Sequence, residues 1–145
     1  MKRHLNILIA IVMLVGILAI NTRAQSASSQ KLIANIPFAF NVGSKTLPAG
    51  RYTITLLSPT SDRRVIQLRS ADGSSTAMVL TLRVNAKAAE DARVVFRRYG
   101  DSYFFAQAQL ADDPTSLNTP KSRAERAQER ALGTRRNSVL TIIAE

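Results

Sequence analysis

The chain of 145 residues has no cysteine, no tryptophan and a single histidine, His4. Without cysteine it can form no disulfide, and it cannot be a lipoprotein whose lipid is attached to a cysteine. Nucleophilic catalysis by serine usually needs a histidine base, and zinc and copper sites usually need histidine or cysteine ligands. His4 lies in an N-terminal segment that we expect to be removed. We therefore expect no enzyme activity, no metal and no cofactor.

The first 24 residues have the pattern of a secretory signal peptide. Met1–His4 is cationic, residues 5–20 are almost entirely apolar, and Thr22 and Ala24 occupy the small-residue positions that a signal peptidase reads. The apolar run is shorter than the roughly 20 residues that span a bilayer comfortably. We expect cleavage between Ala24 and Gln25 and export to the periplasm or the medium. The alternative is an uncleaved membrane anchor.

The 121 residues that remain after cleavage should form one basic domain without a membrane span. Residues 25–32 are expected to be a flexible leader and residues 33–145 a single β-rich domain. The signal contains three of the 20 Lys and Arg and none of the ten acids, so the formal charge falls from +10 to +7. This balance favours contact with polyanions, and solubility alone is the alternative.

Alternating apolar residues predict a series of short strands. Residues 31–42 place a bulky apolar side chain at every second position from Ile36 to Val42, the pattern of a half-buried strand. Pro37 cannot donate to a sheet ladder, so this strand should lie at an edge or begin with a bulge. Further strands are expected at 51–57, 65–69, 77–84, 92–99, 102–110 and 139–144.

The strand expected at 77–84 has two faces of different character. One face carries four large apolar residues: Met78, Leu80, Leu82 and Val84. The other face carries smaller or polar residues: Ala77, Val79, Thr81 and Arg83. We expect the first face to be buried and the second to stay partly in water. The Asp-Gly pair at 72–73, before this strand, is typical of a two-residue hairpin turn.

One helix is predicted near residues 120–132, ahead of the last strand. Ser122 and Glu125 match the capping box, in which each side chain satisfies the backbone N–H of the other residue. Gly133 suits the left-handed position that ends a helix. The apolar stripe of this helix consists of Ala124, Ala127 and Ala131. Because alanine buries little area, we expect the helix to lie loosely on the surface, whereas the β-branched run 139–144 should pair into the sheet.

Seven short strands at regular spacing and one late helix indicate a mainly β fold. The expected architecture is an antiparallel β-sandwich, or a small barrel, of about seven strands, with one C-terminal helix before the last strand. We prefer the sandwich. The sequence shows no internal repeat.

The densest basic cluster provides the first candidate site. Its five members are Arg123, Arg126, Arg130, Arg135 and Arg136. In a helix, the first three would share a face and could bind a polyanion. The partner would then be an anionic envelope component, such as a glycan or a lipid head group, or another protein; no specific nucleic-acid signature is present. The alternative is a solvated helix face on which Glu129 partly offsets Arg126.

A second candidate is a hydrophobic pocket. Four aromatic residues could line a pocket or simply form core: Phe38, Phe40, Tyr52 and Phe105. A closed cavity between them would make the protein a carrier of a small hydrophobic ligand, and solid packing would make them core. Hydrolysis by paired carboxylates is not expected, because the ten acids lie mainly in turns, the helix and the C-terminus.

Three segments resemble a family of small exported β-rich bacterial proteins of unknown function. They are Ile36–Phe40 (IPFAF), Leu47–Tyr52 (LPAGRY) and Phe96–Phe104 (FRRYGDSYF). The resemblance covers nearly all of the chain after the signal, and it implies an exported location and a β-rich fold without any activity. The sequence thus predicts an exported, non-enzymatic binding or structural module of the cell envelope, with the ligand carrier as the alternative.

Overall fold

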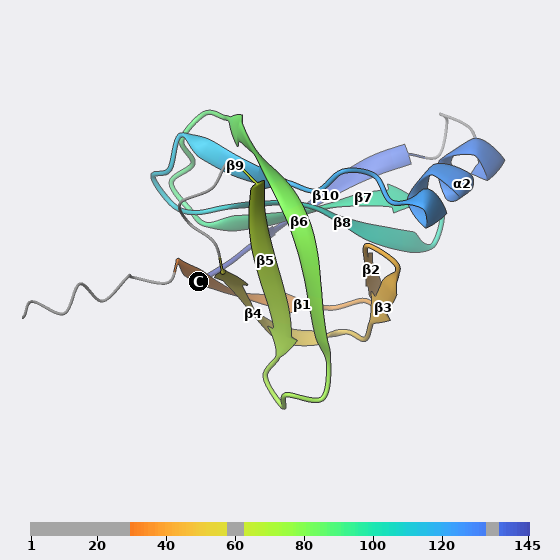
Figure 1. Ribbon diagram of the computed structural model, residues 1–145, viewed down its shortest axis with the longest axis horizontal. Helices are drawn as coiled ribbons and strands as arrows, with labels where there is room; N and C mark the ends of the chain where they lie inside the picture. Colours follow the sequence, from red (N-terminus) through yellow and green to blue (C-terminus); the bar gives the residue numbers. More distant parts are fainter. Residues whose placement is uncertain (1–29, 58–62, 133–136) are drawn as a thin grey trace, which may run out of the picture.

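The computed structural model describes residues 30–57, 63–132 and 137–145, which form ten strands and one helix (Figure 1). The expected signal peptide, Gly133, Arg135 and Arg136 lie outside these ranges. The strands are β1 Lys31–Ile36, β2 Phe40–Val42, β3 Lys45–Leu47, β4 Gly50–Leu56, β5 Arg63–Ser70, β6 Thr76–Asn85, β7 Arg93–Tyr99, β8 Ser102–Gln109, β9 Thr115–Asn118 and β10 Asn137–Ile143. The helix, α2, spans Arg123–Leu132. The mainly β fold and the helix before the last strand are therefore confirmed.

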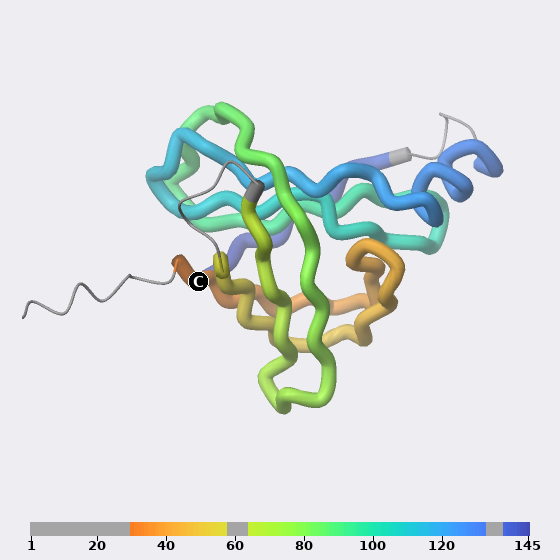
Figure 2. Tube along the Cα trace, in the orientation of Figure 1, coloured from red at the N-terminus to blue at the C-terminus, as the bar shows by residue number. Residues whose placement is uncertain are grey.

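All ten strands belong to one mixed sheet. Its main path is β1-β4-β5-β6-β9-β8-β2-β3, and β7 pairs with both β8 and β10. Every pair is antiparallel except β2 with β8. In Figure 2 the chain from β1 to β4 occupies the lower half and the chain from β7 to β9 the upper half, with β5 and β6 crossing in front. β10 pairs back onto β7, as the β-branched sequence predicted.

Pro37 divides the first predicted strand into two. β1 ends at Ile36 and β2 begins at Phe40, because Pro37 has no N–H to donate to a ladder. Gly43, with φ 63°, then turns the chain into the short strand β3. This division, together with the short strands β3 and β9, explains why the described chain has ten strands and not about seven.

Aromatic rings form the centre of the core. Phe96 on β7 is fully buried and meets the rings of Phe38 and Phe40 edge-to-face, with centroids 5.3 Å apart in both pairs. Phe40 also meets Tyr52 edge-to-face at 5.2 Å, and Phe96 meets Phe105 at 6.0 Å. This geometry is favourable for aromatic pairs, so the cluster joins β2 and β4 to β7 and β8.

The face of β6 that we expected to be buried is the exposed one. Met78, Leu80, Leu82 and Val84 are 60%, 45%, 47% and 42% exposed. Ala77 and Thr81 on the other face are buried, and Thr81 Oγ1 donates a hydrogen bond to the backbone carbonyl of Arg64 (2.8 Å). The backbone of β6 passes close to β2 and β3, nearer than the usual separation of packed sheets of about 10 Å. Only small side chains fit in that space, so the prediction was wrong.

Candidate functional site

The first turn of α2 contains only half of the predicted capping box. Ser122 Oγ accepts a hydrogen bond from the backbone N–H of Glu125 at 3.1 Å, as expected for a helix cap. The side chain of Glu125 points instead toward the sheet, where it is only 2% exposed. The helix is therefore attached to the sheet through a buried carboxylate.

That carboxylate binds two residues of β7. Arg97 donates to both oxygens of Glu125, from Nε to Oε1 and from Nη2 to Oε2, the second at 3.0 Å. The hydroxyl of Tyr99 donates to Oε1 at 3.1 Å. Arg97 Nη2 also donates to the carbonyl oxygen of Thr119 at 3.1 Å. A two-pronged Arg–carboxylate pair of this kind fixes orientation as well as distance.

Burial and charge act together on Tyr99. Desolvation raises the pKa of its hydroxyl above the usual value, and the negative charge of Glu125 raises it further. The hydroxyl therefore stays protonated and keeps donating to Glu125 over a wide pH range.

The inward face of α2 is not the alanine stripe. Glu125 is buried and Gln128, Glu129 and Leu132 are half-buried, a spacing that marks one side of a helix. The predicted stripe is exposed at all three positions: Ala124, Ala127 and Ala131. The expectation of an alanine contact was wrong, because the bonded Glu125 determines which side faces the sheet.

The second acid of the helix is also engaged at the sheet side. Glu129 Oε1 accepts a hydrogen bond from Lys121 Nζ at 2.5 Å, and this bond raises the pKa of Lys121. Glu129 is therefore paired with Lys121, and not with Arg126 as the sequence suggested. Neither acid of α2 lies on its outer side.

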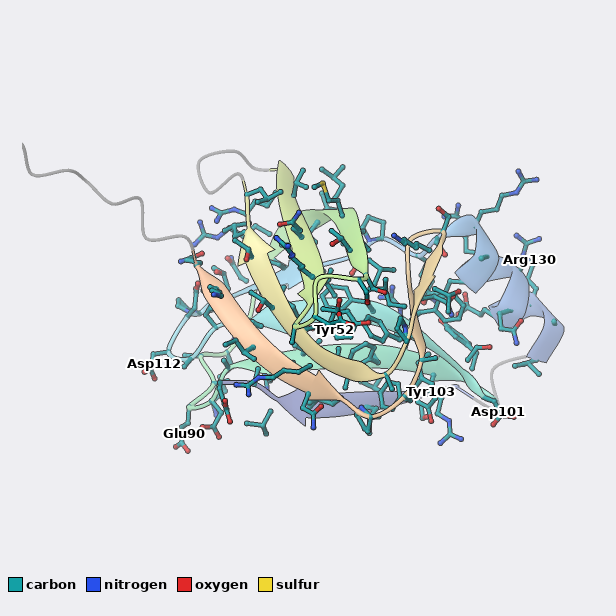
Figure 3. The ribbon with its side chains drawn as sticks, turned by 90° about the horizontal axis from the view of Figure 1, so that it is seen from below. Tyr52, Glu90, Asp101, Tyr103, Asp112 and Arg130 are labelled. Carbon is teal, nitrogen blue, oxygen red and sulfur yellow. The ribbon has the colours of Figure 1, made fainter. Side chains whose placement is uncertain are left out.

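The charged residues on the outer side of α2 are all arginines. Arg123, Arg126 and Arg130 are all exposed, and none of them forms an ion pair with another described residue. At 100° per residue the three lie within an arc of about 60°. Figure 3 shows Arg130 on the side of α2 away from the strands. Of the five predicted arginines, the structure thus brings these three onto one face.

A groove lies beside α2 on the side of the sheet. It has a volume of about 210 Å³ and lies between α2, β7 and β10. Its lining residues are Arg97, Arg98, Tyr99, Lys121, Glu129, Ser138 and Val139. Arg98, unlike Arg97, is exposed, and its guanidinium lies 5.4 Å from the centre of the Tyr103 ring. No local sequence pattern indicates this groove, since it depends on contacts between distant segments.

The four aromatic candidates lie in and beside the core cluster. Phe40, Tyr52 and Phe105 are buried there, and Phe38 is half-buried and stacked on Tyr103 with centroids 3.9 Å apart. The pocket between the two halves of the sheet lies elsewhere and has a volume of only about 30 Å³. Aliphatic residues provide most of its apolar lining: Leu32, Ile54, Leu56, Ile66, Leu110 and Leu117.

Residues 30–57, 63–132 and 137–145 were searched for metal-ligating groups and for membrane-spanning helices. No group of three or more Asp, Glu, His or Cys in these ranges is placed to hold a metal ion. No helix in them is both long enough and apolar enough to cross a membrane.

Comparisons with protein-family models, with curated proteins and with solved structures find no match for this chain. The resemblance carried by the segments at 36–40, 47–52 and 96–104 therefore stays a prediction.

Proposed function

We propose that this protein is an exported, non-enzymatic module that binds an anionic component of the cell envelope through the outer face of α2. The observation that carries the proposal is the segregation of charge on the helix. Glu125 and Glu129 are both engaged on the side of the sheet, so the outer side presents Arg123, Arg126 and Arg130 without a compensating acid. The strongly bent sheet, packed on itself as a sandwich, is the rigid support for this face.

The charge of the whole chain supports the same function. A formal charge of +10, or +7 after removal of the signal, attracts polyanions over distances of about a Debye length. Arginine also suits sulfate, phosphate and carboxylate groups, because its guanidinium can donate two parallel hydrogen bonds. A carrier of small hydrophobic ligands has less support, since such sites usually need about 300 Å³ or more and the inter-layer pocket has about 30 Å³.

Salt-dependent retention on immobilised heparin tests the proposal. The triple variant Arg123→Gln, Arg126→Gln, Arg130→Gln should bind roughly 100-fold more weakly at low salt, since each cation near an anionic surface contributes about 1 kcal/mol. A matched control removes three exposed cations from other elements: Lys31→Gln, Arg51→Gln and Lys87→Gln. The control has the same net charge as the α2 triple variant and should retain most of the heparin binding. Equal losses in the two variants would show that α2 is not the site.

A further inference from the structure

The exposed face of β6 forms an apolar band that the fold of a single chain does not require. The band, called here the β6 stripe, consists of Met78, Leu80, Leu82 and Val84. Val65 of β5 lies opposite Leu80 in the ladder and widens the band. Large apolar residues at alternate outward positions of one strand form a contiguous patch, and such patches mark interaction sites more often than isolated exposed residues do.

The stripe is bordered by positive charge. Lys45 lies beside the start of β6, where its Nζ donates to the carbonyl oxygen of Thr76 at 2.6 Å. Arg69 faces Thr76 across the β5–β6 ladder, on the same face of β6 as the stripe. Both cations are exposed, and neither forms an ion pair with another described residue.

Among the described residues, two acids lie well away from the stripe and a third is engaged at the tip of a hairpin. Figure 3 shows Glu90 and Asp101 on the lower side of the molecule, whereas β5 and β6 lie on the upper side. Asp72 lies at the tip of the β5–β6 hairpin, where its carboxylate accepts hydrogen bonds from Ser70 Oγ and from the backbone N–H of Ser74. In the same view, Arg130 and β6 both lie toward the upper side, so the stripe and the arginine face of α2 can meet one extended surface.

We propose that the anionic partner is the surface of a lipid bilayer, which the β6 stripe enters while the surrounding cations contact the head groups. This inference rests on the proposed function and names its partner. A bilayer surface offers an apolar region directly beneath a layer of negative charge, which matches an apolar band bordered by cations. A soluble anionic glycan has no apolar layer to cover the stripe. A second copy of the chain would bring the same two cations against those of the first.

Binding of the protein to lipid vesicles tests the inference. The sample is the exported protein, and sequencing of its N-terminus shows that residues 1–24 are absent. The vesicles contain phosphatidylglycerol and phosphatidylcholine in equal amounts, or phosphatidylcholine alone. Replacing two residues of the stripe, Leu80→Thr and Leu82→Thr, should weaken binding to the anionic vesicles by roughly ten-fold. The matched control, Leu140→Thr with Ile143→Thr, changes two exposed residues of β10 that do not line the groove beside α2 and should bind like the wild type.

The outcomes separate this inference from the proposed function. If the stripe variant binds vesicles more weakly while its heparin retention is unchanged, both the lipid proposal and the proposed function are supported. If the stripe variant binds anionic vesicles as strongly as the wild type does, the lipid proposal is overturned. This holds even where the α2 variant shows reduced retention on heparin. Equal binding to neutral and anionic vesicles also overturns it. So does a concentration-dependent dimer that the stripe variant abolishes, because a second copy would then cover the stripe. Failure of the wild type to bind heparin at low salt overturns the proposed function itself.

Discussion

Tyr52 connects the turn before β4 to the core through both ends of its side chain. Its ring packs edge-to-face on Phe40 at 5.2 Å, and its hydroxyl donates to the carbonyl oxygen of Pro48 at 2.7 Å. The hydrogen bond closes the turn Leu47–Gly50, so a tyrosine two residues after the glycine has a structural purpose. The segment LPAGRY is thus explained by folding alone, without a ligand.

The same burial makes the stability of the protein sensitive to high pH. Desolvation raises the pKa of Tyr52 above its ordinary value of 10.0, and the charge of Asp72 raises it further. Above about pH 10 the unfolded chain therefore ionises this tyrosine first, and stability present at lower pH is lost as the pH rises through the folded-state pKa.

Tyr52→Phe should remove this part of the pH dependence. At neutral pH the variant should lose about 1 kcal/mol of unfolding free energy, the usual contribution of one hydrogen bond. As the pH rises above about 10, the wild type should lose more stability than the variant, because only the wild type has a tyrosine at position 52 to ionise. Urea unfolding at a series of pH values measures the difference. Parallel curves for the two proteins would contradict the prediction.

At the scale of elements, one buried carboxylate should account for most of the attachment of α2. Glu125→Ala leaves Arg97, whose side chain is only 23% exposed, without its partner. We expect a loss of about 3 kcal/mol of unfolding free energy, because an uncompensated charge then remains in a poorly solvated position. The measurement is urea unfolding near neutral pH.

Two further variants control this prediction. Glu129→Ala breaks the pair with Lys121, in which both side chains are about one-third exposed, and should cost less than about 1 kcal/mol. The double variant Glu125→Leu with Arg97→Leu removes both charges and should be more stable than Glu125→Ala. If the two single glutamate variants lose equal stability, the carboxylate of Glu125 has no special part in docking the helix.

The sequence predicted the existence of these elements better than the direction in which their faces point. The strands at 93–99 and 102–109 flank the turn at Gly100, and the helix begins beside Ser122; these are local signals. An alternating pattern defines two faces but does not say which is buried. The inward side of β6 depends on its approach to β2 and β3, and the inward side of α2 depends on Arg97. In both cases the partner lies far away in the sequence. The arginine face could be predicted, since helical spacing alone produces it, whereas the engagement of both acids could not.

At the scale of the whole molecule, the last two residues connect the beginning of the described chain to its final strand. The backbone N–H of Ile33 donates to the carbonyl oxygen of Glu145, and the N–H of Glu145 donates back to the carbonyl of Ile33, both at 2.8 Å. The N–H of Ala144, a buried residue, donates to the carbonyl of Ala92 at 2.8 Å. These contacts join β1 to the segment that follows β10, so they link two parts of the sheet that do not otherwise pair.

Removal of Ala144 and Glu145 should therefore weaken a link between distant parts of the molecule. Three backbone hydrogen bonds are lost, and at about 1 kcal/mol each we expect the unfolding free energy to fall by roughly 2–3 kcal/mol. Hydrogen exchange should accelerate most at the amide of Ile33, while the amides of β1 that bond to β4 stay protected. Arg51→Gln is the matched control, because it removes only the exposed ion pair of Arg51 with Glu145 at 3.3 Å and keeps the backbone bonds. Unchanged exchange at Ile33 after the truncation would mean that β1 is held by β4 alone.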